Sequence, residues 1–574
     1  MMLLGLRVST TCKTFRVCPL QQTIQGQQPY INQNPCPSST HFEPLRCVWL
    51  PQFTDAKILV DKYIEDIDHV HHIAHSPSIP AVLDDVYECL NQGQVKPGNI
   101  MLLLGIFAAA TQTWVQSDCR RGLFSTSAEA NNQSLIWIKA LEDVLDVYHR
   151  TSSVPIEGIQ AISIASFVLL NMEGYTRRCK ALFDMALNLS RDLGLHLLDH
   201  PSNAQSANSA RTEIGRRVWW YLVATDWFAM RFNGGLQGYY HCHPRHMMVR
   251  KPLNVNDEDV IDGMSCIEQP LSHPTTMSFV LQRLHSSEIS RRMVDRTPLM
   301  MGLAGGPSHD VVMDIDTEYQ TFLNDTPPFF SMSVVDLTAT YQLSPSRAAN
   351  IAHQGYMLYS HIHAHRCTLH FPYFSRSFTD PTYASSRDIC LRSARLVIQS
   401  ESQLEKSGIA ATRYSFLACL VAVFMASIVV LMDLCYNKAP CQQEKHRAEL
   451  AEAIRILEQA RHKSETAARF LDSLMHVLRK HKVLPPKRAG VGSEQLSGGP
   501  MAYSSMSGLP MSGASSSTLG TNEAGGINMA DDAFANGEDL SSYFDELAQS
   551  FEQSVDVGSF DWNSIFSGLD TPVF

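Results

Sequence analysis

Two groups of histidines have the residue type and part of the spacing that a metal site needs. The groups are His69, His71, His72 and His75, and then His361, His363 and His365. On a helix, His71 and His75 would face the same side and share a metal ion, and so would the pair at 361 and 365. Neither pair continues at the same four-residue spacing into a cysteine or carboxylate that would complete the ligand set. The sequence therefore predicts no metal at either group.

The run from Asp84 to Glu88 has the Asp-Asp-x-x-Glu spacing with which all-α terpene cyclases hold magnesium against a diphosphate. Those enzymes also need an Asn-x3-Ser-x3-Glu motif, and no asparagine of the chain begins one. Basic residues that would receive a diphosphate are not grouped nearby. We interpret these acids as residues at a helix N-terminus, where the macrodipole favours negative charge. A terpene-cyclase-like enzyme remains the alternative.

The 14 cysteines are dispersed between residues 12 and 441, and no two form a Cys-x2-Cys pair. A long chain with scattered cysteines is typical of a reducing compartment with buried thiols rather than of a disulfide scaffold. No Gly-x-Ser-x-Gly motif, phosphate-binding loop or dinucleotide fingerprint occurs. We therefore predict that the chain is not an enzyme and that it carries no cofactor.

Charge is distributed unevenly along the 574 residues. Arg488 is the last basic residue, and 12 acids follow it: Glu494, Glu523, Asp531, Asp532, Glu538, Asp539, Asp545, Glu546, Glu552, Asp556, Asp561 and Asp570. Residues 1–488 hold all 46 bases and the remaining 45 of the 57 acids, so this part is nearly neutral. Such a sign asymmetry indicates an interaction tail.

Composition divides the chain into four parts. Residues 1–54, rich in Gln, Pro, Ser and Thr, are predicted to be a flexible, disordered leader. Residues 55–485 show apolar residues at helical spacing without convincing strand alternation, which predicts an all-α body. Residues 486–530 are rich in Gly, Ser, Met and Ala and are predicted to be a tether. Residues 531–574 are predicted to be a disordered acidic-hydrophobic activation segment.

The body is expected to consist of helices, because apolar residues recur every three or four positions along it. We expect them from residue 54 onward and over residues 84–90, 136–148, 159–171, 177–198, 212–232, 275–297, 315–323, 346–370, 385–406, 411–436 and, as one long final helix, 450–478. Residues 414–432 carry no charge and are nearly long enough to span a membrane. Because this segment is alone and has little basic bias in its flanks, we interpret it as a buried core helix.

The acidic tail combines its charges with large apolar residues at helical spacing. The first group is Leu540, Tyr543, Phe544, Leu547 and Phe551, and the second is Phe560, Trp562, Ile565, Phe566 and Leu569. Acids keep such residues solvated, so they stay available to fold as a helix into a partner's groove. This pattern is typical of an activation segment. A C-terminal helix that packs on the chain's own body is the alternative.

Several blocks of the body resemble the regulatory (middle homology) domain of fungal zinc-cluster transcription factors. The family's Arg-Arg-x-Trp-Trp…Asp signature is matched by Arg216, Arg217, Trp219, Trp220 and Asp226. Similar blocks occur at 186–196, at the acidic loop 252–259, and at 59–71 with the turn 77–79, and the tail segment 561–566 is also similar. The resemblance implies an all-α regulatory body that responds to small molecules or partners. Trp219, Trp220 and Trp227 are expected to pack in the core, with an effector cavity lined by them as the alternative.

The DNA-reading module of that family is not matched. It needs six cysteines in two Cys-x2-Cys pairs around two zinc ions, whereas the first cysteines here are Cys12, Cys18, Cys36 and Cys47. The first 50 residues contain four basic residues and no basic cluster. Zinc, and direct contact with DNA, are therefore expected only if a zinc-cluster exon lies upstream of Met1. Otherwise the chain would reach DNA through a DNA-bound partner.

The sequence therefore predicts a nuclear transcription regulator that controls a metabolic or secondary-metabolite gene set. Its expected partners are transcription co-activators, which would bind the acidic tail, and a homodimer or heterodimer fits the resemblance. No membrane is expected. The other alternative is a co-regulator or scaffold that acts without DNA contact.

Overall fold

The computed structural model describes residues 15–17, 48–92, 96–150, 152–229, 239–262, 268–297, 307–406, 415–436, 440–461 and 465–480. Within these ranges the regular elements are helices apart from one short strand pair, so the predicted all-α class is confirmed. The tether 486–530, the acidic segment 531–574 and most of the leader 1–54 lie outside the described residues. Their predicted boundaries and roles stay predictions.

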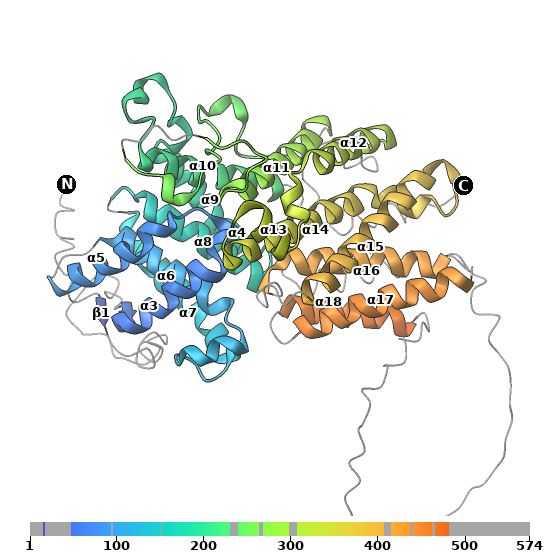
Figure 1. The fold of residues 1–574 in the computed structure, drawn as a ribbon, viewed down its shortest axis with the longest axis horizontal. Helices are drawn as coiled ribbons and strands as arrows, with labels where there is room; N and C mark the ends of the chain where they lie inside the picture. The colour runs from blue at the N-terminus through green and yellow to red at the C-terminus, as the bar shows by residue number, and fades with distance from the viewer. Residues whose placement is uncertain are drawn as a thin grey trace, which may run out of the picture.

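The first half of the body is a group of helices around one large apolar core (Figure 1). Its helices are α3 (Phe53–Asp66), α4 (Asp68–His71), α5 (Ile79–Asn91), α6 (Pro97–Gln112), α7 (Ser127–Tyr148), α8 (Ile156–Glu173), α9 (Arg177–Asp192) and α10 (Ala210–Ala229). Helix α6 contacts α3, α7 and α8 because its residues 100–110 are apolar on every side. Gly105 permits a close approach to α8, since a Cβ there would lie 3.1 Å from the carbonyl oxygen of Ala161.

The second half is organised along helix α14, which packs against α11, α12 and α13 and against α15 and α16. Its helices are α11 (Ser278–Arg296), α12 (His309–Asp325), α13 (Val334–Tyr341), α14 (Pro345–Arg376), α15 (Ala384–Lys406), α16 (Leu417–Tyr436), α17 (Pro440–Ala460) and α18 (Glu465–Lys480). A small apolar cluster that includes Val70, Tyr356 and Phe416 joins the two halves. The two halves of the body are therefore in direct contact.

Hydroxyl side chains fix where many of these helices begin. An N-cap oxygen accepts a hydrogen bond from a backbone N–H of the first turn, which would otherwise lack a partner. The capping residues are Thr126 of α7, Thr176 of α9, Ser308 of α12, Ser333 of α13 and Ser344 of α14. Local polar residues thus define helix starts, and the apolar stripes define which faces are buried.

Two of the described helices, α8 and α16, are long and apolar enough to cross a membrane by length and composition. Within the body, 72% of α8 and 83% of the apolar window of α16 are buried. Helix α16 contacts α14, α15, α17 and α18, which explains why it needs apolar residues on every side. Both are core helices, as predicted for the segment 414–432.

The structure corrects three details of the sequence prediction. The expected single helix 450–478 is two helices, α17 and α18, because the polar residues after Ala460 interrupt the apolar stripe and α18 packs back on α17 and α16. A short parallel strand pair, β1 (Phe15–Val17) with β2 (Val48–Leu50), was not expected. The acids at Asp84 and Asp85 do not begin a helix, because α5 already starts at Ile79, next to Pro80.

Candidate functional site: a buried charge network around helix α10

Helix α10 is buried over most of its length, charged residues included. Arg216 and Arg217 are only 2% and 1% exposed, and the rings of Trp219 and Trp220 are buried beside them. A buried guanidinium without a partner is strongly unfavourable, so both arginines require carboxylate partners. Those carboxylates come from three separate segments of the chain.

Arg216 binds two carboxylates at once. Its Nε and Nη2 donate to Asp199 at 3.0 and 2.5 Å, and its Nη1 donates to Glu213 at 3.1 Å. Arg250 also donates to Asp199, through its backbone N–H at 2.7 Å and its Nε at 2.9 Å. Burial by itself raises the pKa of Asp199, but these donors outweigh burial and lower the pKa to about 2. The contacts tie α10 to the segment before it and to the loop after it.

Arg217 begins a chain of alternating charges. Its Nη1 donates to Asp257 Oδ1 at 2.6 Å, and His72 Nε2 lies 2.8 Å from the same oxygen. On the other side of the imidazole ring, Nδ1 lies 3.2 Å from Asp68 Oδ2. We call Asp68, His72, Arg217 and Asp257 the buried charge network, since all four are at most 3% exposed. It connects α4, α10 and the acidic loop 252–259.

The backbone of His72 is itself unusual. It adopts φ 49° and ψ 38°, in the left-handed region, and it ends helix α4. A residue other than glycine in this region is uncommon, and surrounding contacts must hold it there. Here the two carboxylates on either side of the ring supply those contacts. The turn also explains why His71 and His75 do not share a helix face.

The network has a balanced charge when His72 is protonated, with two carboxylates and two cations. Burial by itself lowers the pKa of His72, but Asp257 and Asp68 outweigh burial and raise the pKa to about 9. Burial likewise opposes the charged form of Asp257, yet His72 and Arg217 hold the pKa of its carboxyl far below the usual range. His72 is therefore a bridging imidazolium at neutral pH.

We expect the protein to lose stability as pH rises from about 6.5 to about 9. The raised pKa exists only in the folded state, so the contribution of His72 is complete below its unfolded pKa and disappears as it deprotonates near pH 9. Linkage gives a loss of up to about 3 kcal/mol. Thermal unfolding of wild type and His72→Asn at several pH values measures it. An equal slope in both proteins would contradict the assignment.

The indoles of α10 fix the loop that follows the helix. Trp220 Nε1 donates to the carbonyl of Arg250 at 2.7 Å, and Trp227 Nε1 donates to the carbonyl of Cys242 at 3.0 Å. Asp226 accepts from the backbone N–H groups of His241 and Cys242 at 3.1 and 2.8 Å. The predicted core packing of Trp219, Trp220 and Trp227 is confirmed, because all three residues are buried.

The histidine groups do not assemble the metal sites that their spacing allows. His71 packs edge-on against Phe167, whereas His75 bonds Ser78 and the carbonyl of Asp257. The rings of His361 and His365 do lie 4.0 Å apart, but they pack against Phe228. Among the described residues, one group of three potential ligands is close enough for a metal: Asp68, His72 and Asp257. Both nitrogens of His72 and one oxygen of Asp257 are already engaged there.

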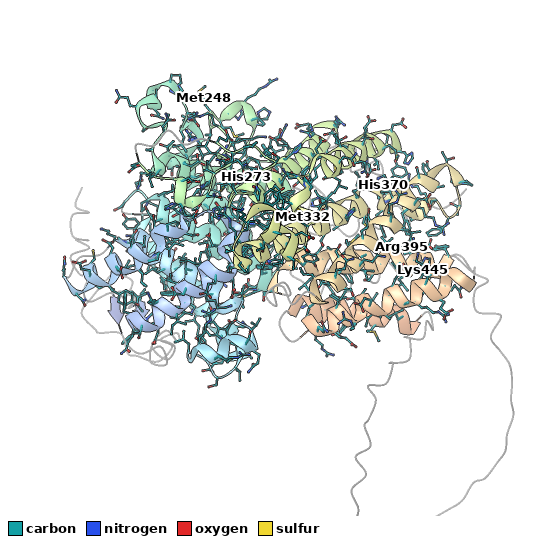
Figure 2. All side chains as sticks on the ribbon, in the orientation of Figure 1. Met248, His273, Met332, His370, Arg395 and Lys445 are labelled. Carbon is teal, nitrogen blue, oxygen red and sulfur yellow. The ribbon has the colours of Figure 1, made fainter. Side chains whose placement is uncertain are left out.

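A Ser-His-Asp series of contacts occurs in the second half of the body. Its histidine is His370, which is labelled in Figure 2. Ser386 Oγ lies 3.0 Å from His370 Nδ1, and His370 Nε2 lies 3.2 Å from Asp316. Ser386 and His370 are 0% exposed, so no substrate reaches the hydroxyl. Arg366 also binds Asp316 with two nitrogens, at 2.6 and 2.9 Å. The arrangement joins α12, α14 and α15 and is not a hydrolytic site.

The Asp-Asp-x-x-Glu run is likewise a structural contact. Asp85 accepts from Lys96 Nζ at 2.6 Å and from Asn99 Nδ2 at 3.0 Å, which joins α5 to the start of α6. These donors lower the pKa of Asp85. With its carboxylate committed to the first turn of the next helix, this run does not present a magnesium site.

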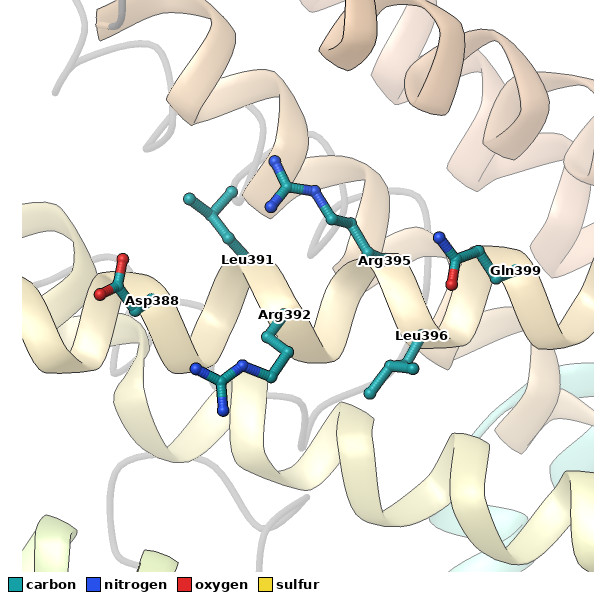
Figure 3. Close-up of a pocket in the computed structure, with 6 residues that line it drawn as sticks. All are labelled: Asp388, Leu391, Arg392, Arg395, Leu396 and Gln399. Carbon is teal, nitrogen blue, oxygen red and sulfur yellow. The ribbon is translucent and has the colours of Figure 1, made fainter. Parts of the chain in front are cut away.

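A surface hollow of about 340 Å³ lies along α15. Figure 3 shows its lining residues, all from this one helix: Asp388, Leu391, Arg392, Arg395, Leu396 and Gln399. Arg395 also donates to Glu449 of α17 at 2.9 Å. The hollow is not lined by the tryptophans of α10, so it is not the effector cavity considered from the sequence.

Comparison with known proteins identifies the body. Residues 62–296 match the model of the fungal specific transcription factor domain, a range that contains the whole buried charge network. The chain is 32% identical over 571 residues to the probable transcription factor lepB of Aspergillus flavus. The matched region covers 97% of this chain and 99% of that protein. The chain belongs to the fungal transcription factor family. It is a transcription regulator and not an enzyme.

Two further fungal transcription factors match shorter parts. Transcription factor TAS2 of Pyricularia oryzae is 31% identical over 368 residues, 63% of this chain and 47% of that protein. The agnestins biosynthesis cluster transcription factor AgnL11 of Paecilomyces divaricatus is 28% identical over 437 residues, 75% of this chain and 62% of that protein. In each of these two relatives, a large part of the protein's own length is not matched by this chain.

The structure of this fungal transcription factor brings together all five predicted signature residues on α10. It also shows residues that the sequence did not single out, namely Asp68, Asp199, Glu213 and Arg250. Among the described residues, no three cysteines lie close enough to hold a zinc ion. The first four cysteines and all ten predicted activation residues, 540–569, lie outside the described ranges.

Proposed function

We propose that this fungal transcription factor acts in the nucleus and controls a metabolic or secondary-metabolite biosynthetic gene set. The observation that carries the proposal is the match to lepB over nearly the whole of both chains. The name of AgnL11, a regulator of a biosynthesis cluster, supports the choice of target class. The acidic tail supports activation rather than repression as the outcome.

The body, residues 55–485 in the proposed division, serves as the regulatory domain. Its signature residues Arg216, Arg217, Trp219, Trp220 and Asp226 hold the opening helices, α10 and the loop after α10 in one arrangement. The contact between Arg217 and Asp257 supports that role, because Asp257 also bonds His72 of the opening segment, 185 positions away. A partner or ligand that bound any one of these segments would act on all of them through the same charges.

The tail, residues 531–574, recruits transcription co-activators through its two groups of apolar residues, and residues 486–530 serve as the tether. Contact with DNA comes either from a zinc cluster encoded upstream or from a DNA-bound partner, such as a related factor with which this chain pairs. The cysteines of the chain do not supply a six-cysteine cluster, so no step of recognition is assigned to them.

Deletion of the gene, followed by transcript profiling, tests the proposal. We expect the transcripts of one set of biosynthetic genes to fall together, while most other transcripts keep their levels. A second copy of the gene should restore them. Unchanged transcripts under conditions in which the protein is present would contradict the proposed function, and a set that rises would reverse the proposed activating outcome.

A further inference from the structure

Arg283 is a half-buried cation without a carboxylate partner among the described residues. It lies in the first half of helix α11, and its Nη2 donates to Thr225 Oγ1 of α10 at 2.7 Å. Burial lowers the pKa of Arg283, and no described acid offsets that effect. Arg216 and Arg217, by contrast, are each paired with a carboxylate. Enclosing a cation without a counter-charge costs free energy, so Arg283 requires a role other than stability.

Aromatic rings surround this guanidinium. Its central carbon lies 4.8 Å from the ring centre of Tyr221 and 5.5 Å from that of Phe228, both on α10. Phe228 in turn packs edge-on against His361 of α14, with ring centres 4.8 Å apart. The face of an aromatic ring attracts a cation but does not neutralise its charge. Arg283 therefore lies in an aromatic environment with its charge still uncompensated.

The neighbouring His71 has a similar deficit. It is 1% exposed, and neither ring nitrogen makes a hydrogen bond within the described part of the chain. Its ring packs edge-on against Phe167 of α8 at 4.0 Å and lies 6.2 Å from the ring of Tyr221. Burial and the nearby charge of Arg283 lower the pKa of His71 to about 3, so the ring is neutral and carries one N–H donor. A buried donor normally has an acceptor, and here none is present among the described residues.

Half-buried side chains mark accessible space around these groups. Thr225 is the one residue of 215–229 in α10 that is not buried, and Phe167 is the one of 158–169 in α8. Phe167 also borders the apolar cluster that joins the two halves of the body. Helix α10 contacts α8 and α11, and α14 contacts α4 and α11, in the middle of the body (Figure 1). These core helices thus keep accessible surface at one common junction.

We propose that this junction binds a small aromatic carboxylate through Arg283 and His71. The carboxylate accepts hydrogen bonds from the guanidinium and from the imidazole N–H, so it supplies both the missing counter-charge and the missing acceptor. The rings of Phe167, Tyr221 and Phe228 pack against the apolar part of the ligand. A single cation matches one negative charge, which favours a carboxylate over a phosphate dianion. The inference goes beyond the proposed function, because it names a ligand class for the regulatory body.

Calorimetric titration of the purified full-length chain with 2-naphthoate tests the inference. This probe joins one carboxylate to an apolar two-ring body, and 2-naphthamide is its uncharged counterpart. We expect wild type to bind 2-naphthoate about tenfold or more tightly than 2-naphthamide, because only the acid pairs with the cation. The dianion 2-naphthyl phosphate should bind more weakly than the carboxylate. A chain that binds none of the three probes, or that does not prefer the carboxylate, overturns the inference.

Arg283→Met removes the charge and retains much of the side-chain volume. It should lower the affinity for 2-naphthoate about tenfold or more and leave that for 2-naphthamide unchanged. The matched control is Arg296→Met on the same helix, where the side chain is 42% exposed, and it should bind as wild type does. Because no described carboxylate loses a partner, Arg283→Met should unfold at a temperature no lower than the control. A marked loss of stability would make Arg283 structural and would overturn the assignment.

His71→Phe provides an independent second variant. It keeps an aromatic ring against Phe167 and removes both ring nitrogens, so the packing of α4 on α8 is retained. We expect the affinity for 2-naphthoate to fall several-fold, the effect of one lost hydrogen bond to a charged group. Wild-type affinity in both Arg283→Met and His71→Phe would show that the probe binds elsewhere, which contradicts the proposed site. Each of these readouts is binding to the purified chain, so it is distinct from the transcript levels that test the proposed function.

Discussion

Replacement of Arg217 by Met is expected to destabilise the body by about 3–5 kcal/mol, the cost of leaving a buried carboxylate without its partner. Arg217 is 1% exposed and lies 2.6 Å from Asp257, which is itself buried. Methionine retains much of the side-chain volume, so the loss reflects charge rather than a cavity. The difference in the free energy of unfolding, measured by chemical denaturation, gives the effect.

Arg211→Met is the matched control on the same helix. Arg211 is 70% exposed and lies 3.7 Å from Glu157, so its loss should cost at most about 1 kcal/mol. Adding Asp257→Asn to Arg217→Met should recover part of the stability, because the unpaired carboxylate is removed with its partner. Equal effects of Arg211→Met and Arg217→Met, or strict additivity in the double variant, would contradict the network.

Residues 523–574, fused to a heterologous DNA-binding domain, should activate a reporter gene. Replacement of Phe544, Leu547 and Phe551 by Ala should lower the signal about tenfold or more, because each truncated anchor of a helix in a groove costs about 2 kcal/mol. The three residues fall on one helical face, at i, i+3 and i+7. Reporter expression, normalised to the amount of fusion protein, measures the effect.

Ser541→Ala/Ser542→Ala/Ser550→Ala is the control for that experiment, since it changes neighbouring residues and leaves every apolar residue in place. It should keep the wild-type signal. A silent wild-type fusion would favour the alternative in which the tail packs on the chain's own body. A signal that survives the loss of Phe544, Leu547 and Phe551 would show that the acids alone are sufficient.

The fold class follows from local patterns. Helix α6 and helix α16 are predictable because uninterrupted apolar runs of that length must be buried on every side. The start of α9 at Arg177 was predicted and coincides with its hydroxyl cap, Thr176, whereas α12 begins at His309, six residues before the expected 315. The division of 450–478 into two helices is harder to predict from the sequence, because both halves are amphipathic and only the break near Ala460 marks the change of direction.

The partners of the charged residues could not be predicted in the same way. Two adjacent arginines on an apolar helix require acids, but the chain has 57 of them. Asp257 lies 40 positions from Arg217 and 185 from His72, and no local periodicity encodes such a pairing. The helical spacing of His71 and His75 was misleading for a related reason. The left-handed backbone of His72 ends the helix on which the two side chains would share a face.

The most direct test of the account is transcript profiling of the deletion strain complemented with either the full chain or residues 1–488. The shorter chain keeps the body but lacks the 12 acids and ten apolar residues of the tail. The account predicts that the full chain restores the biosynthetic transcripts, whereas residues 1–488 leave those transcripts low. Full restoration by residues 1–488 would contradict it.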